Sequence, residues 1–307
     1  MLVELSEPVE VPSEVCVDWQ GWHVGSAGPR SATLLHEPSP RYIEDGVLTT
    51  DRLYPGDLEA LASGDLVAIR IPKFLGKQKC RDLAKFFNCH PNRDLYGQNV
   101  ADPSAPGGVR YLNFDVDKVG VPRNTLIGKC ADSLEAERYF AGSEILMDQV
   151  REICGGVHPI ERVIAHANEV YIDGAERERI FDREAFVGIG RITNADKGSV
   201  LTKLPHVDGP WKEYTAHLSV NVYLRASTKG GELEVLTGKP LSAQEVAAVG
   251  PEHDFRVEDY SPRIIHPRRG DAIFINTRLP HAVSGINRIS ISSFLGIAPN
   301  QPIKFYS

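Results

Sequence analysis

The order of apolar and polar residues changes character about halfway along the chain. In the first half, residues 65–75 are typical of a strand that leads into a turn, and residues 77–88 have their apolar side chains at helical spacing. Residues 98–125 are rich in Gly, Pro, Asn and Asp, which favours a long irregular segment of the kind that often forms a lid. A longer helix is predicted from Asp132, as its N-cap, to the Gly155–Gly156 pair.

In the second half the apolar residues form short runs that are separated by turn residues. The charged stretch 175–183 is predicted to be a surface helix or loop. Short strands at this spacing are typical of a β-sandwich or barrel. The predicted strands cover residues 162–172, 187–192, 214–224, 231–236, 272–276 and 289–297.

We therefore predict a mainly β fold with helical support, a double-stranded β-helix (jelly roll, cupin-like) with an N-terminal α/β extension. Because no clean linker separates the two halves, we expect a single domain over residues 1–307. Residues 1–156 would form the helical support and the lid. Residues 157–307 would form the double-stranded β-helix core.

Composition and charge disfavour several classes of protein. The chain of 307 residues carries 34 Lys and Arg against 41 Asp and Glu, a net charge of -7, which disfavours a nonspecific binder of nucleic acid or anionic membranes. No apolar run approaches the about 20 residues that span a bilayer, and the N-terminus lacks the pattern of a signal peptide. The five cysteines fit neither a disulfide framework nor a zinc site. We expect a cytoplasmic protein with a small-molecule substrate, in an oligomeric state that the sequence leaves open.

Three residues of the second half have the chemistry of a metal site. His206 and Asp208 are two residues apart, so in an extended segment their side chains point to the same side. His281 supplies a second imidazole. Two histidines and one carboxylate form the facial triad of non-haem Fe(II) oxygenases, which leaves coordination positions open. An HxD pair alone occurs by chance in many proteins, so the surrounding pattern matters.

Two predicted strands near these residues have a continuous polar face. In 214–224 the polar residues alternate with apolar ones, and in the last strand Arg288, Ser290 and Ser292 share one face. A polar strand face usually meets water, but two such rows could instead line a barrel mouth that holds a polar ligand. We favour the second interpretation because Arg288 follows His281 by seven residues, across a predicted turn. An arginine fork suits a bidentate carboxylate contact.

The order of motifs from residue 200 to 297 resembles the Fe(II)/2-oxoglutarate-dependent dioxygenase superfamily. It is most similar to the branch with a prolyl-hydroxylase-type HxD…H core, among the members that modify small molecules or amino acids. The motifs are HVDG at 206–209, Tyr223-Leu224, GGEL at 230–233, Arg269-Gly270-Asp271, His281, and the RxS sequence from Arg288 to Ser290.

The resemblance implies a role for each matching residue. His206, Asp208 and His281 would bind Fe(II), and the cosubstrate 2-oxoglutarate would chelate the iron. Its far carboxylate would pair with Arg288, helped by Ser290 and Tyr223. Because the gap between His281 and Arg288 is shorter than in many relatives, Arg278 is a second candidate for that pairing.

The resemblance also implies a reaction. With O2, the enzyme would convert 2-oxoglutarate to succinate and CO2 and hydroxylate an unactivated C–H bond. Because Asp208 is present, hydroxylation is expected rather than halogenation, while desaturation and ring closure remain open. The expected substrate is a free amino acid or a biosynthetic intermediate. A protein or peptide side-chain hydroxylase and a noncatalytic metal-binding cupin sensor are the alternatives.

Further residues are candidates for contact with the substrate. Each also has a structural interpretation, such as a packed histidine at position 217, a hydrophobic plug at position 211 or a solvated loop at position 110. The candidates are Arg191, Trp211, Asn221, His217 and Arg110.

Overall fold

The computed structural model describes residues 41–101, 104, 109–193, 205–209, 213–227, 230–249, 255, 260–283 and 287–307. Side chains at 98–101 and 109–115 are outside this description. The residues from Pro38 to Ser307 cluster into one compact unit. The prediction of a single domain over 1–307 stays a prediction, since residues 1–37 lie outside the described part.

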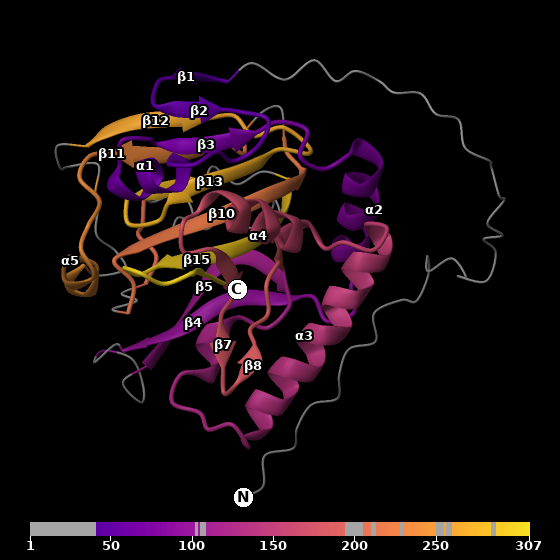
Figure 1. Cartoon of the computed structure of the whole chain (residues 1–307). Helices are drawn as coiled ribbons and strands as arrows, with labels where there is room; N and C mark the ends of the chain where they lie inside the picture. Colours follow the sequence, from indigo (N-terminus) through magenta and orange to yellow (C-terminus); the bar gives the residue numbers. More distant parts are fainter. Residues whose placement is uncertain are drawn as a thin grey trace, which may run out of the picture. The chain divides into compact units, whose positions relative to one another are not determined.

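A large mixed sheet forms the centre of this unit, and Figure 1 shows β13, β10 and β15 running side by side through its middle. Within the described residues the sheet has eleven strands in the order β1-β2-β3-β13-β10-β15-β9-β5-β4, with β16 beside β15 and β6 beside β16. The strands are β1 (Tyr42–Glu44), β2 (Val47–Thr49), β3 (Ala68–Ile71), β4 (Asp94–Ala101), β5 (Val109–Val119), β6 (Ala175–Arg177), β9 (Ile189–Thr193), β10 (Ala216–Arg225), β13 (Ala272–Asn276), β15 (Arg288–Ile297) and β16 (Ile303–Tyr306).

A smaller antiparallel sheet packs against one face of the large one. It has the order β12-β11-β14, formed by β12 (Ser261–Ile265), β11 (Leu233–Thr237) and β14 (His281–Val283). A buried cluster joins Val235 of β11 to Tyr223 of β10 and Ile273 of β13. Two sheets that pack through their inner faces form a jelly roll, so the predicted fold class is confirmed. A separate short hairpin pairs β7 (Arg179–Ile180) with β8 (Arg183–Glu184).

Helices cover the opposite face of the large sheet. Val220 of β10, Phe274 of β13 and Ile291 of β15 belong to the same buried cluster as Phe87 of α2. A Cβ added at Gly190 of β9 would lie 2.4 Å from Cδ1 of Phe87, so α2 packs directly on the strand backbone. The helices are α1 (Asp57–Ser63), α2 (Lys77–Asn88), the 3-10 helix η2 (Arg123–Leu126), α3 (Leu134–Ile153), α4 (Pro159–Val170) and α5 (Ala243–Ala248).

Several predicted elements are confirmed. The predicted helix 77–88 is α2, and the predicted strand 272–276 is β13, each with the same bounds. Strands β3, β9, β10, β11 and β15 lie within two residues of, or inside, their predicted segments. These segments pack one apolar face on a continuous core, so the spacing of their apolar residues identifies them.

Other predictions were wrong. Residues 162–172 form most of helix α4 instead of a strand, because Pro159 begins the helix, His158 and Glu161 form a capping box, and Ile160, Val163 and Ala167 bury one helical face. Residues 98–125 are mainly strands β4 and β5, paired as a long antiparallel hairpin rather than an irregular lid. Residues 175–183 contribute β6, β7 and the start of β8. The N-cap of α3 is Ser133, whose side chain accepts from the amide of Ala136, and not Asp132.

No helix among the described residues is both long and apolar enough to cross a membrane.

The buried N-cap of α4 leads to a prediction about pH. The His158 imidazole accepts a hydrogen bond from the Ile160 amide, and burial lowers its pKa to about 3. The unfolded chain has a histidine pKa of about 6.5. Between these two values the unfolded state binds a proton that the folded state does not, so stability is lost as pH falls from about 6.5 towards about 3. The slope approaches about 1.4 kcal/mol per pH unit for this one group.

We expect His158→Asn, which keeps an N-cap acceptor, to reduce that slope. Urea unfolding of both proteins at pH 7 and pH 5 would measure it, and the wild type should lose about 1–2 kcal/mol more than the variant over this interval. Other buried histidines affect both proteins equally and cancel in the difference. Equal losses in the two proteins would contradict the prediction.

Candidate metal centre

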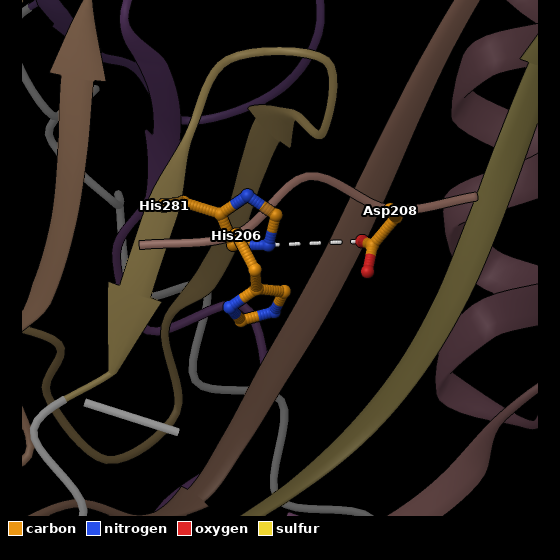
Figure 2. Close-up of side chains that lie close together, drawn as sticks. All are labelled: His206, Asp208 and His281. Carbon is orange, nitrogen blue, oxygen red and sulfur yellow. Dashed lines mark ion pairs between the residues drawn. The ribbon is translucent and has the colours of Figure 1, made fainter. Parts of the chain in front are cut away.

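Backbone pairing brings the two predicted histidine ligands together. His206 and His281 form an isolated antiparallel bridge, in which each amide donates to the other carbonyl at 2.9 Å. The Asp208 amide donates to the carbonyl of Thr277, just after β13, at 3.1 Å. One extended segment therefore lies along the edge of β14 and presents both of its side chains to His281 (Figure 2).

The three side chains converge on one point. Their ligand atoms all lie within 4.8 Å of one another, and Nε2 of His281 is 3.7 Å from Oδ2 of Asp208. The His206 and His281 ring centroids are 4.6 Å apart. Two imidazole nitrogens and one carboxylate oxygen at this separation match the donor set of a facial triad. The predicted ligand residues are thus placed together, and they fit a divalent metal such as Fe(II).

A carbonyl fixes the orientation of the His281 ring. Nδ1 of His281 lies 3.0 Å from the carbonyl oxygen of Leu279. Because a carbonyl can only accept, Nδ1 carries the proton, and Nε2 keeps its lone pair on the side of Asp208. A metal-binding histidine needs this tautomer, and a backbone carbonyl is one of its usual partners.

The charges in the site favour the metal-binding forms of these residues. Burial and, to a smaller extent, the neighbouring His206 lower the pKa of His281 to about 4, so the imidazole is neutral near pH 7. Burial alone would raise the pKa of Asp208, but His281, His206 and Arg191 outweigh it and the net pKa is lowered. An ionised carboxylate beside a neutral imidazole is ready to coordinate a cation.

Arg288 and Tyr223 lie on the inner face of the large sheet with buried donors that have no partner. Arg288 is 7 % exposed, and neither its Nε nor its Nη1 has a hydrogen-bond partner among the described residues. Tyr223 is 0 % exposed, and its hydroxyl has no partner within the same part of the chain. Cζ of Arg288 is 5.4 Å from the centroid of the Tyr223 ring. Buried polar groups are nearly always satisfied, so adjacent orphaned donors indicate a site for an anion.

The strand register places Ser290 beside these two residues. Ser290 of β15 is opposite Tyr223 of β10. Its hydroxyl lies 3.2 Å from that of Ser292, which in turn donates to Oδ1 of Asn221 at 2.6 Å. Since directly opposed residues share a sheet face, these polar side chains form one continuous row on the inner face.

The turn at Arg269-Gly270-Asp271 holds the backbone of Tyr223. The Gly270 amide donates to the Tyr223 carbonyl at 2.7 Å, and the Tyr223 amide donates to the Asp271 carbonyl at 2.9 Å. Gly270 has φ +89, and a Cβ there would lie 2.4 Å from the Leu75 carbonyl oxygen, so only glycine fits. Asp271 is tied by an ion pair of 2.6 Å to Arg70.

Arg278, the second candidate for the carboxylate, is engaged by the backbone. It is 4 % exposed, and its Nη1 and Nη2 donate to the carbonyls of Thr215 and Tyr214 at 2.6 Å each. These bonds use the fork of the guanidinium to hold the start of β10. Arg288 therefore remains the candidate for the anion site.

His217, on β10, is buried with both ring nitrogens engaged. Nδ1 is 2.6 Å from Oγ1 of Thr277, and Nε2 is 2.7 Å from the Tyr306 hydroxyl. Burial lowers the pKa of His217 to about 3. Because the Thr277 carbonyl accepts from the Asp208 amide, His217 supports the segment that carries this ligand. Both ring nitrogens of this substrate candidate are thus used within the protein, and its contact with a substrate stays a prediction.

Of the other four substrate candidates, two have described side chains and two do not. Arg191, on β9, is half-buried near the centre, and Asn221 is buried in the polar row. Arg110 lies on β5 with its side chain outside the described part, and Trp211 is outside the described residues. Sequence reasoning missed Thr277, Leu279 and Tyr306, which hold the ligands in place. Only the position of Thr277 and Leu279 just before His281 could have indicated them.

Comparisons with known proteins give a likeness to solved structures only. No family model matches the chain, and no curated protein matches it. An N-substituted L-amino acid dioxygenase from Burkholderia ambifaria AMMD is 10% identical and aligns over 70% of this chain and 100% of its own, with a TM-score of 0.42.

Two further solved structures have similarly low sequence identity to this chain and similar TM-scores. HygX from Streptomyces hygroscopicus, with nickel and 2-oxoglutarate bound, is 15% identical over 80% of this chain and 88% of its own (TM-score 0.37). A Pseudomonas putida prolyl-4-hydroxylase is 14% identical over 78% of this chain and 97% of its own (TM-score 0.36). The resemblance predicted from the motifs is confirmed as a likeness to solved structures of such proteins.

Proposed function

We propose that this protein is an Fe(II)- and 2-oxoglutarate-dependent oxygenase that hydroxylates a C–H bond of a small molecule, with a free amino acid or a biosynthetic intermediate as substrate. One observation carries the proposal. Leu279, whose carbonyl orients the His281 ring of the triad, packs in one buried cluster with Tyr223, so the triad and the orphaned donors of Arg288 and Tyr223 face the same interior. A metal site beside buried donors for an anion is the arrangement that a chelating keto-diacid requires.

One group of residues would bind the metal, and another would bind the cosubstrate. His206, Asp208 and His281 would hold Fe(II), while Arg288 and Tyr223, with Ser290 beside them, would bind the far carboxylate of 2-oxoglutarate. When bound, the iron, 2-oxoglutarate and O2 supply the oxidation that releases succinate and CO2. The protein orients these groups, and its buried walls exclude water from them.

The two alternatives predict different results in solution. A protein or peptide side-chain hydroxylase would act on peptides and not on free small molecules. A noncatalytic metal-binding cupin would bind iron without 2-oxoglutarate. The orphaned donors of Arg288 and Tyr223 disfavour the second alternative. Without an anion to bind, these buried donors would lower the stability of the protein and serve no purpose.

Binding and turnover can be tested separately. Under anaerobic conditions, 2-oxoglutarate added to the Fe(II)-loaded protein should raise the melting temperature and produce a visible charge-transfer absorbance. In air, pools of amino acids should then increase succinate release above the uncoupled rate, and a mass gain of one oxygen would identify the hydroxylated product. A protein that binds iron but shows neither response to 2-oxoglutarate would contradict the proposal.

A further inference from the structure

A second arginine, Arg191, faces the same interior as Arg288. Strand β9 pairs with β15 on one side and with β5 on the other, and Arg191 is opposite Ser290 and Lys118. Because opposed residues share a sheet face, Arg191 lies in one row with Tyr223, Ser290 and Lys118 across four strands. Its side chain therefore lies on the inner face, next to the proposed 2-oxoglutarate site.

The charge of Arg191 is not neutralised by an acid within the described part of the chain. Its Nε is buried and has no hydrogen-bond partner, and no acidic side chain of the described residues forms an ion pair with it. Its neighbour Lys118 differs, because Nζ of Lys118 lies 2.9 Å from Oδ2 of Asp94. Asp94 therefore neutralises the charge of Lys118, while no such ion pair is made by Arg191 within the described part of the chain.

Two aromatic rings hold the Arg191 guanidinium in place. Its Cζ is 5.4 Å from the ring centroid of Tyr96 and 5.4 Å from that of Phe294. Aromatic rings attract a guanidinium through its charge, but they accept no strong in-plane hydrogen bonds. The rings therefore orient the group and leave its N–H donors for a planar, bidentate acceptor such as a carboxylate.

The charge of Arg191 lowers the pKa values of two residues of the proposed active site. Against the effect of burial, it helps the two histidines to lower the pKa of Asp208. Burial is the main cause of the lowered pKa of Arg288, and Arg191 lowers that pKa further, whereas Tyr223 raises it. Among the described residues, the guanidinium groups of Arg288 and Arg191 thus face the same interior as the carboxylate of Asp208, which is a proposed metal ligand. A bound 2-oxoglutarate would use one carboxylate at the metal and the other at Arg288. The Arg191 charge would then still lack an anion.

We propose that Arg191 binds a carboxylate of the substrate, and that the substrate is therefore a small organic acid, such as an amino acid with a free α-carboxylate. This inference rests on the proposed function and narrows its substrate class. Arg191 would hold one end of the substrate and place the rest of the molecule towards the metal. Arg288 and Arg191 would thus separate the cosubstrate anion from the substrate anion.

Matched pairs of acids and amides test the inference by binding. Protein loaded with Ni(II), which does not support turnover, and with 2-oxoglutarate is titrated calorimetrically with the proteinogenic amino acids, their N-acetyl derivatives, and the primary amides of both sets. At least one acid should bind the wild type on the order of 10- to 100-fold more tightly than its amide. In Arg191→Met this preference should disappear, with the amide affinity unchanged, and Arg191→Lys should retain part of it.

Two controls separate the inference from the proposed function and from misfolding. Lys118→Met removes a cation from the same row and should retain the acid preference, because Asp94 already neutralises that lysine. Titration with 2-oxoglutarate before the acids should give dissociation constants within about threefold for wild type and Arg191→Met. The amide affinity and the melting curves report whether each variant is folded.

Several results would overturn the inference. They are equal binding of acids and amides by the wild type, an acid preference that survives in Arg191→Met, or no binding of any acid by protein that does bind 2-oxoglutarate. Loss of 2-oxoglutarate binding in Arg191→Met would also overturn it, by assigning the residue to the cosubstrate while leaving the proposed function intact. A wild type that fails to bind 2-oxoglutarate would reject both proposals.

Discussion

Asp208→Ala should abolish substrate-coupled succinate release. Asp208 supplies the anionic ligand of the triad, with its Oδ2 3.7 Å from Nε2 of His281. Without it, only the two imidazoles of the triad remain to hold a divalent cation. Substitutions of residues that merely orient a ligand typically cost 10- to 100-fold in metal affinity or activity, so loss of the ligand itself should cost at least about 100-fold. Anaerobic calorimetry with Fe(II) and an aerobic succinate assay would measure the two effects.

A surface carboxylate provides the matched control for this experiment. Glu152, on α3, is exposed, and Glu152→Ala should leave both metal affinity and succinate release unchanged. Metal-free Asp208→Ala should melt no lower than the wild type, because the substitution removes a carboxylate and leaves the backbone bond from residue 208 to Thr277 in place. Coupled turnover within threefold of the wild type would show that the three residues do not form the metal site.

Arg288→Met should have opposite effects on stability and on 2-oxoglutarate binding. In the ligand-free protein the Arg288 guanidinium is buried with Nε and Nη1 unsatisfied, which costs free energy. Methionine fills much of the same volume without a charge, so the ligand-free variant should be about 1–3 kcal/mol more stable than the wild type. Its affinity for 2-oxoglutarate should fall by about 100-fold or more, since two charge-assisted hydrogen bonds are lost.

Arg278→Met is the matched control, because the two arginines are similarly buried but differently bonded. Arg278 is bonded to the carbonyls of Thr215 and Tyr214, which its removal would leave without this donor. We expect Arg278→Met to be destabilised by about 2–4 kcal/mol and to bind 2-oxoglutarate with nearly unchanged affinity. Thermal melts with and without 2-oxoglutarate would compare all three proteins. If Arg288→Met loses stability as Arg278→Met does, Arg288 has a structural role.

Arg288 and Arg278 are expected to differ in their effect on stability because only Arg288 belongs to the proposed binding site. A site for a dianion must present donors before the ligand arrives, and in the meantime those donors are desolvated without partners. Binding sites commonly reduce the stability of the free protein in this way. In this protein Arg288 and Tyr223 carry this cost, while Arg278 donates through Nη1 and Nη2 to backbone carbonyls and His217 is hydrogen-bonded at both ring nitrogens.

Much of the fold could be predicted wherever one apolar face sets the periodicity. Helix α2 and strands β10, β13 and β15 bury alternate or helically spaced residues on one core, and the sequence pattern identifies all four. The prediction fails at residues 162–172, where β-branched residues suggested a strand. The capping box of His158 and Glu161 and the buried stripe of α4 decide in favour of a helix. It also fails at 98–125, where turn-forming residues concealed the pairing of β4 with β5.

Residue types, together with the order of the surrounding motifs, predicted the ligands of the candidate metal centre. HVDG, His281 and the RxS segment can be read along the chain, because coordination chemistry restricts which side chains can serve and the extended backbone restricts their spacing. The sequence does not distinguish Arg278 from Arg288, since both are arginines close to His281. It also does not indicate that His217 is enclosed by Thr277 and Tyr306.

The chain by itself thus determined the alternation of its strands, the types of side chain available to a metal, and the class of chemistry they suit. Only the tertiary structure decided which of these side chains meet. The bridge between residues 206 and 281 and the register of β9, β10 and β15 bring distant segments within hydrogen-bonding distance. The physical reason is that the need for a partner depends on burial, and burial is a property of the packed sheets rather than of any one segment.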